Sequence, residues 1–141
     1  MNENIILRPF EAKDFQAVID LLQHISAYRP ALDIIEELPH TFVQQTDNYS
    51  CVAVRDKRVI AFGSVYIYMR VRGGKSGLIE DMVVASGMRG QGIGGRVLAE
   101  LLRESRSRGC FKITLEASTV AEKFYQSAGF KNSGKVMKLM L

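Results

Sequence analysis

Apolar residues recur along the chain with two periods, one typical of helices and the other of strands. Residues 5–10 are rich in apolar side chains and predict a strand, and Asp14 stands where a helix cap is expected. The apolar residues that follow share one helix face: Phe15, Val18, Ile19, Leu22 and Ile25. A second helical stretch covers about residues 34–45, with Pro39 near its middle.

The middle of the chain alternates between strand patterns and one long helix pattern. Residues 51–68 form two β-rich runs around the polar pair Asp56-Lys57, which predicts a hairpin. Residues 78–84 predict a further strand. A glycine-rich stretch follows and leads into a helix that Gly109 ends. The apolar stripe of this helix consists of Ile93, Val97, Leu98, Leu101 and Leu102.

The last third predicts a strand at 111–116, a short helix at 119–130 and a closing strand at 134–141. Thr119 and Glu122 have the spacing of a capping box. The expected order is β-α-α-β-β-β-α-β-α-β. A helix joins strands 78–84 and 111–116, so these two run parallel if they share a sheet. The expected fold class is therefore α/β (α+β), with a mixed, partly parallel central sheet and helices on both faces.

Composition limits the function only broadly. The 141 residues, 47% of them hydrophobic, suit a single domain over residues 1–141 with one packed core. The net charge of +4 comes from scattered basic residues, so no nucleic-acid partner is predicted. No leader sequence and no apolar run near the ~20 residues of a membrane span are apparent. We therefore predict a cytoplasmic protein without a membrane partner.

The cysteines and histidines predict no metal site. Cys51 and Cys110 lie far apart without metal-ligand spacing and are flanked by strand-like residues, so we expect buried, reduced thiols. His24 and His40 are isolated, and neither stands beside a cysteine that it would activate.

The glycine-rich stretch is the strongest candidate for a ligand site. The first N–H groups of a helix lack partners within it, and together with the helix dipole they favour an anion. Glycines let this backbone approach a phosphate, and Arg89 adds a positive charge. The glycines at the start of the helix are Gly90, Gly92, Gly94 and Gly95.

Two classes of phosphate ligand compete for this loop. Residues 90–95 match the dinucleotide fingerprint G-x-G-x-x-G, and Glu116 stands where a ribose-binding acid is expected. However, residues 85–89 separate the loop from its strand, and the chain has only one βαβ unit. A P-loop is excluded because no Gly-Lys-Ser/Thr follows. The other class is coenzyme A.

Two motifs carry a resemblance to a known family. "RGQGIG" (89–94) has the pattern R-x-x-G-x-G at the start of a helix, and "AEKFYQSAGF" (121–130) follows it in the expected order. Together they resemble the GNAT superfamily of acyl-CoA-dependent N-acyltransferases. The resemblance implies the GNAT sheet and acetyl-CoA as co-substrate. The residues that it assigns to acetyl-CoA are Met82, Val83, Val84, Arg89, Gly90, Gln91, Gly92, Ile93, Gly94 and Gly95.

Three further segments, 77–84, 109–116 and 131–137, resemble the branch of this superfamily that acetylates glucosamine 6-phosphate. The resemblance implies an amino-sugar phosphate as acceptor, and a homodimer in which the C-terminal "KVMKLML" pairs with a second chain. The chain departs from the branch at Leu78, where the branch has histidine. The alternatives are another small amine, a protein or peptide amine, or a domain that binds acyl-CoA without turnover.

Acyl transfer to an amine requires a group that removes a proton from the amine and one that protonates the departing thiolate. Glu80 is the candidate for the amine proton, directly, through a water or by orienting the acceptor. Its neighbour Asp81 points to the opposite face of a regular strand, and we assign it, with Glu116, to acceptor binding. The resemblance makes Tyr125 the thiolate's proton donor. A domain that only bound acyl-CoA would need neither Glu80 nor Tyr125.

Overall fold

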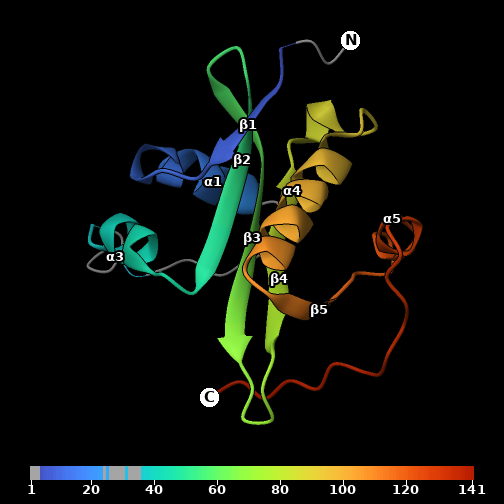
Figure 1. Cartoon of the computed structure of the whole chain (residues 1–141). Coiled ribbons are helices and arrows are strands. Elements are labelled where there is room, and N and C mark those ends of the chain that lie inside the picture. Colours follow the sequence, from blue (N-terminus) through green and yellow to red (C-terminus); the bar gives the residue numbers. More distant parts are fainter. Residues whose placement is uncertain (1–3, 24, 26–30, 32–35) are drawn as a thin grey trace.

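The computed structural model describes residues 4–23, 25, 31 and 36–141. His24 and the beginning of the second predicted helix lie outside these ranges. The described residues form a five-stranded sheet in the order β1-β2-β3-β4-β5, with β4 and β5 parallel and the other neighbours antiparallel (Figure 1). The strands are β1 (Ile6–Pro9), β2 (Asn48–Arg55), β3 (Arg58–Met69), β4 (Lys75–Val84) and β5 (Cys110–Leu115). The mixed, partly parallel sheet is therefore confirmed.

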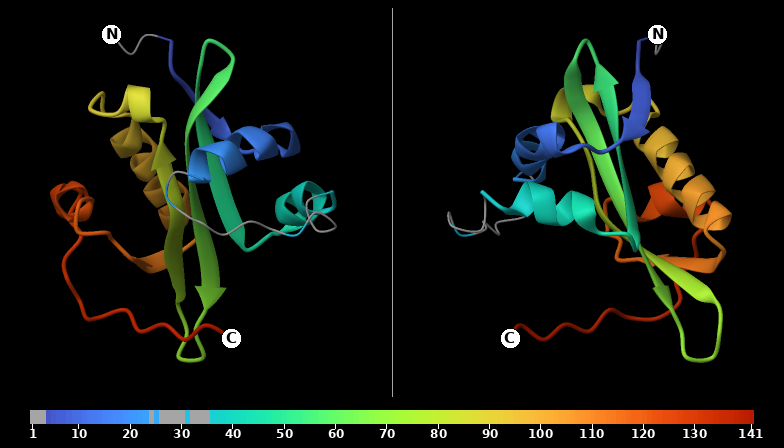
Figure 2. Two further views of the ribbon diagram at one scale, coloured as in Figure 1. Left: turned by 180° about the vertical axis from the view of Figure 1, so that it is seen from behind. Right: turned by 60° about the vertical axis from the view of Figure 1, so that its left-hand side comes forward.

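Helices cover both faces of the sheet, as the sequence predicts. Helices α1 (Phe15–Leu22) and α3 (Leu38–Gln44) lie on one face, and α4 (Ile93–Ser107) lies on the other (Figure 2). A short helix, α5 (Glu122–Ser127), follows β5. No helix in the described ranges is long and apolar enough to cross a membrane.

Helix α4 anchors the larger of two apolar cores. The apolar stripe predicted for it faces the sheet, where Val97 and Leu101 are fully buried and Leu102 is partly buried. Gly109 ends the helix with a φ of 88°, a conformation that favours glycine. The smaller core lies beneath α1 and consists of Val18, Val52, Phe62 and Val83.

The hairpin prediction is also confirmed. Strands β2 and β3 meet at the two-residue turn Asp56-Lys57, and both residues have positive φ values, 50° and 64°. A turn of this kind matches the twist of the flanking strands. Cys51 of β2 is buried as predicted, whereas Cys110 is only partly buried because β5 is the outermost strand of the sheet.

One of the two predicted helix caps is in place and the other is wrong. Asp14 is the N-cap residue of α1, but its side chain makes no capping hydrogen bond, because it also ends the short 3-10 helix η1 (Ala12–Asp14) and its carboxylate accepts from the backbone N–H of Glu11. Thr119 does not cap the last helix. That helix begins at Glu122. The preceding turn is closed instead by hydrogen bonds from the backbone of Ala121 to Ser118.

Pro39 marks a helix start and does not interrupt a helix. It lies in the first turn of α3, where the missing N–H of proline has no helical partner to lose. His40, in the next position, is exposed.

The predicted C-terminal strand is wrong. Residues 131–141 belong to no strand, and they run past the end of the sheet instead of along one of its edges (Figures 1 and 2). A β-rich pattern forms a strand only where a neighbouring strand accepts its hydrogen bonds, and the tail has none within the described chain. Its apolar side chains are consequently exposed, with Met137 at 94% and Leu139 at 83% of their full accessibility.

A buried ion pair fixes the connection from β1 to α1. Asp14 is 4% exposed, and its carboxylate oxygens lie 2.7 and 2.8 Å from the two terminal nitrogens of Arg8. Burial raises the pKa of Asp14, but the hydrogen bonds from Arg8 and from the Glu11 backbone outweigh it, so the pKa is lowered overall. A lowered pKa in the folded state means that the ionised carboxylate stabilises the fold above its unfolded pKa.

We expect Asp14→Asn to lower the free energy of unfolding by about 2 kcal/mol at pH 7, because Arg8 loses its buried partner. The difference from wild type should shrink as the pH falls through the lowered pKa of Asp14, where the wild-type carboxyl is protonated as well. Urea unfolding at several pH values measures this. The exposed Asp20→Asn is the control and should change stability by less than about 0.5 kcal/mol. If Asp14→Asn lowered the free energy of unfolding by the same amount at every pH, the ion-pair explanation would be contradicted.

Candidate active site

Strand β4 contains a bulge at its centre. Ser64 of β3 faces Glu80, and two residues earlier Phe62 faces Val83, so the ladder accommodates one extra residue of β4. Asp81 absorbs the irregularity with a φ of 59°, which aspartate tolerates better than most residues. Beyond the bulge, the side chains of β4 alternate between the two faces of the sheet in the opposite order. Part of the β4 backbone at the bulge is also left without regular hydrogen bonding to β3.

The pairing between β4 and β5 ends immediately before this bulge. The last pair is Ile79 with Leu115, so Glu80 and Glu116 are the first residues beyond the ladder on their strands. Beyond this point β4 continues to Val84 without a parallel neighbour, while the chain leaves β5 toward α5 (Figure 1). Backbone groups on that side of β4 are therefore open to a ligand that enters between the two strands.

Three carboxylates gather at the opening. Partial burial raises the pKa of Glu80, and the negative charges of Asp81 and Glu116 raise it further, while Lys138 opposes them. Burial also raises the pKa of Asp81. Lys138 Nζ lies 4.0 Å from a carboxylate oxygen of Glu116. The tail thus brings one positive charge to a cluster of negative charges that would hold an ammonium group.

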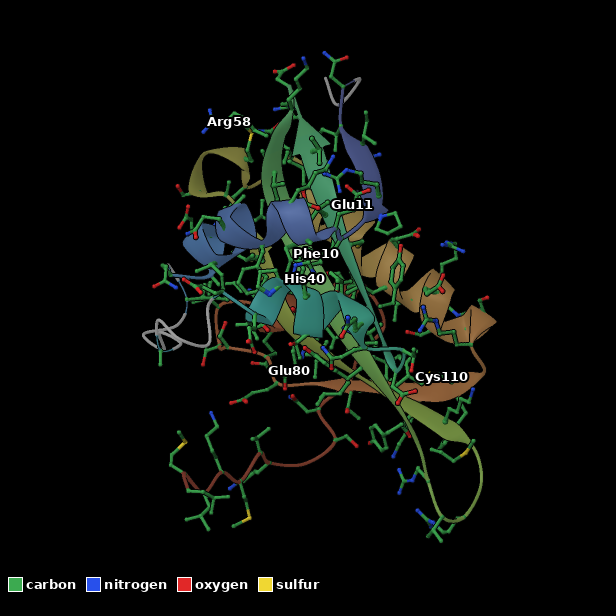
Figure 3. All side chains as sticks on the ribbon, turned by 90° about the vertical axis from the view of Figure 1, so that its left-hand side faces the viewer. Phe10, Glu11, His40, Arg58, Glu80 and Cys110 are labelled. Atoms are coloured by element: carbon green, nitrogen blue, oxygen red, sulfur yellow. The ribbon has the colours of Figure 1, made fainter. Side chains whose placement is uncertain are left out.

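Glu80 lies on the face of the sheet that α1 and α3 cover. It is paired with Ser64, which shares this face with Phe62 in the core beneath α1. Figure 3 looks onto this side of the molecule and shows Glu80 beyond the edge of α3. Glu80, the candidate for the amine proton, therefore lies on the α1 and α3 face.

The glycine loop joins the end of β4 to α4 in the conformation that the sequence predicts. Gly90 and Gly92 have φ values of 79° and 77°, and Gly92 is the N-cap of α4. A Cβ at either position would meet no atom within 4 Å, so these glycines border open space. The free N–H groups of the first turn of α4 follow directly, beginning at Ile93. The loop therefore presents a helix N-terminus and open space, the features that an anion-binding site requires.

Tyr125 lies near the other wall of this opening, on α5. It is 9% exposed and stacks edge-to-face with Phe124 and Phe130. A Cβ placed on Gly94 would lie 3.5 Å from both Phe124 and Val84, so α5 packs where α4 begins and β4 ends. Burial raises the pKa of Tyr125, which keeps the phenol protonated at neutral pH.

The structure thus gathers the predicted residues around one opening. The end of β4, the loop and the start of α4 contribute the residues assigned to acetyl-CoA, while the bulge and the end of β5 contribute the carboxylates. Among the described residues, no three His, Cys, Asp or Glu side chains form a group that would hold a metal ion.

Sequence reasoning missed two features. Lys138, in the predicted strand, lies beside Glu116 instead. A row of polar side chains also runs from Ser50 through Ser64 to Glu80 across three strands. Only the strand register reveals this row, because the three residues are widely separated in sequence.

The family model described as the acetyltransferase (GNAT) family matches residues 16–130. The chain belongs to this family. It is therefore an N-acyltransferase that uses acetyl-CoA as co-substrate. Among curated relatives, the glucosamine 6-phosphate N-acetyltransferase of Arabidopsis thaliana is 31% identical over 94% of this chain and 93% of its own length. The glucosamine 6-phosphate N-acetyltransferase 1 of Dictyostelium discoideum is 29% identical over 100% of this chain and 94% of its own length.

Solved structures agree with the fold. An acetyltransferase from Trypanosoma brucei has a TM-score of 0.87 at 27% identity, covering 98% of this chain and 100% of its own. The Arabidopsis thaliana glucosamine-6-phosphate N-acetyltransferase has a TM-score of 0.85 at 28% identity, covering 98% and 99%. The chain therefore matches these proteins over nearly their whole lengths.

We expect Gly92→Ala to weaken acetyl-CoA binding about tenfold, because an alanine at positive φ strains the N-cap and shifts the N–H groups that follow. Titration calorimetry measures the affinity. Gly87→Ala is the matched control, since Gly87 lies in the preceding turn without a positive φ and with open space around its Cβ position. Unchanged affinity in a folded Gly92→Ala protein would exclude the loop from the site.

Proposed function

We propose that this enzyme transfers the acetyl group of acetyl-CoA to the amine of glucosamine 6-phosphate. The observation that carries the proposal is the cluster of Glu80, Asp81 and Glu116 at the point where β4 and β5 separate. A cationic amine is attracted to this cluster, and the glycine loop follows the C-terminal end of the same strand. The choice of glucosamine 6-phosphate as acceptor rests on the names of the relatives that match nearly the whole chain.

The residues would divide the reaction among them. Glu80 accepts a proton from the ammonium group of the acceptor, directly or through a water, and its raised pKa makes it a stronger base than an ordinary glutamate. The free amine then attacks the thioester carbon, so that a C–N bond forms and the C–S bond breaks. A backbone N–H in Met82–Val84, beyond the bulge, donates to the carbonyl oxygen.

Tyr125 gives its phenolic proton to the departing thiolate, and the acylated nitrogen, which still carries one proton more than the amide, returns that proton to the phenolate directly or through a water. Ordinary phenols and thiols have similar pKa values, so this transfer is feasible, while the burial that raises the pKa of Tyr125 keeps its proton in place until the thiolate departs. Asp81 and Glu116 hold the acceptor so that its amine faces Glu80. The presence of both Glu80 and Tyr125 favours turnover over a domain that only binds acyl-CoA.

The homodimer expected from the sequence also remains part of the proposal. The tail, residues 131–141, carries apolar side chains that one chain leaves exposed, including Val136, Met137 and Leu139. Strand β5 is an outer strand of the sheet and offers unpaired backbone groups. A second chain would give the tail a strand to pair with and an apolar surface to cover. The cytoplasmic location stays a prediction.

Release of free coenzyme A across a panel of amines tests the activity. We expect glucosamine 6-phosphate to be acetylated with the highest kcat/KM, ahead of glucosamine, other small amines and a lysine peptide.

Tyr125→Phe should lower kcat about 10²-fold and leave the KM for acetyl-CoA nearly unchanged, because only the proton donor is lost.

A preferred amine without a sugar phosphate would contradict the proposed acceptor. A Tyr125→Phe variant with normal kcat would instead contradict the proposed proton donor. An acyl donor with a more acidic thiol leaving group provides the control, since it needs little protonation and should restore much of the lost rate.

Light scattering at micromolar concentration tests the dimer. We expect twice the mass of one 15.8 kDa chain, and Met137→Asp should shift the mass to that of a monomer. Met137 is almost fully exposed in one chain, so the substitution affects only an interface and not the core. The matched control, Lys135→Ala, should remain dimeric. A monomeric wild type would rule out the tail as an interface.

A further inference from the structure

A row of hydroxyl groups crosses the sheet toward the proposed acceptor site. Ser50 of β2 faces Ser64 of β3, and Ser64 faces Glu80 of β4. Facing residues of neighbouring strands point to the same side, so all three side chains lie on the α1 and α3 face. Ser64 is fully buried and Ser50 is 8% exposed, whereas Glu80 is open to solvent. The row therefore leads from the core to the site.

The two serines form one hydrogen bond with each other and have one proton left over. The Ser50 and Ser64 hydroxyl oxygens are hydrogen-bonded, and either one can be the donor. When Ser50 donates, the proton of Ser64 is available for a further acceptor. A buried hydroxyl strongly favours such a partner, because an unpaired polar group in the core is destabilising.

Tyr66 is the neighbour that completes the row. It follows Ser64 by two residues on β3, so it shares the same face, and it pairs with Leu78 beside Glu80. The strand register places the Ser64 hydroxyl beside the Tyr66 side chain on this face, and Ser64 lowers the pKa of the Tyr66 phenol. Unlike Ser64, Tyr66 is only partly buried, so part of its side chain is accessible to a ligand.

The surroundings of Tyr66 keep its phenol protonated. Burial raises the pKa of Tyr66, and the negative charges of Asp81 and Glu80 raise it further against the opposing hydrogen bond from Ser64. Its phenol is therefore neutral at neutral pH and retains a proton to donate. The carboxylates can bind only the cationic or donor groups of an acceptor, so a neutral donor beside them supplies what they lack.

We propose that Tyr66 binds the acceptor by donating its phenolic proton to an acceptor oxygen, and that the Ser50–Ser64 pair holds Tyr66 in place. The inference rests on the proposed function, because it assigns the acceptor to the side of the bulge where Glu80 lies. The ligand group is a hydroxyl or phosphoryl oxygen on the same molecule as the amine. Ser64 acts through Tyr66 and is a positioning residue.

Tyr66→Phe tests the inference because it removes the hydroxyl and keeps the ring. We expect the KM for the amine to rise about tenfold, with the KM for acetyl-CoA and the thermal midpoint unchanged. The matched control is Tyr68→Phe, since Tyr68 lies two residues further along the same face and is 47% exposed. Tyr68→Phe should leave both KM values unchanged.

Ser64→Ala tests the link between the two residues. It should raise the KM for the amine severalfold in the wild-type background and have no further effect in the Tyr66→Phe background. Additive effects would show that Ser64 does not act through Tyr66. A Tyr66→Phe variant with a normal KM for the amine, or with a lower thermal midpoint and both KM values raised, would overturn the inference.

The amine in these assays is whichever member of the panel the wild-type enzyme acetylates best, with glucosamine 6-phosphate included. If the wild type prefers another amine but Tyr66→Phe raises its KM, the sugar-phosphate proposal fails and the inference holds. If the wild type prefers glucosamine 6-phosphate and Tyr66→Phe leaves its KM unchanged, the inference fails alone. If the wild type acetylates no amine, both fail.

Discussion

The extra residue at Asp81 is the constraint on which the site depends. A regular β4 would keep its backbone groups paired with β3, and Glu80 and Val83 would point to opposite faces. The bulge instead places both side chains on the α1 and α3 face and leaves the backbone between them out of register. Since the β4 and β5 ladder ends at Ile79, just before the bulge, the opening and its acidic lining lie at the same place on β4.

The other parts of the site need a rigid support, which α4 provides. Its first residue, Ile93, is 1% exposed, so the start of the helix is anchored in the core while the glycines before it border open space. Anchoring fixes the direction of the free N–H groups, which is what an anion site requires. The ring of Phe124 against the same turn then ties α5, and with it Tyr125, to this anchor.

The acceptor side is built differently, from charges and hydroxyls that come from distant segments. The carboxylates lie on β4 and after β5, Lys138 comes from the tail, and the serine row crosses from β2. The two proposed binding regions therefore differ in the kind of group that they present to a substrate. In the proposed arrangement, backbone groups would bind the phosphates and side chains would bind the acceptor, and side chains are the part that can change to accept another amine.

The sequence by itself determined most of the elements and the glycine loop. The helix and strand periods, the Asp56-Lys57 turn and the glycines at Gly90 and Gly92 are local features, and each has a local physical cause. The motifs around Arg89 and Tyr125 likewise lie in short continuous segments, so the GNAT resemblance was visible without a structure. The fold class therefore followed from the sequence, as did the places of the glycine loop, Glu80 and Tyr125 in the order of elements.

Tertiary structure alone decided the strand register and the fate of the tail. A regular hairpin about Asp56-Lys57 would place Ser50 opposite Gly63, and only the irregularity near Val54 shifts it to Ser64. Residues 134–141 have a strand pattern but no strand to pair with, because the availability of a partner is a property of the assembled sheet. Register and pairing depend on residues far apart in the chain, and no local pattern encodes them.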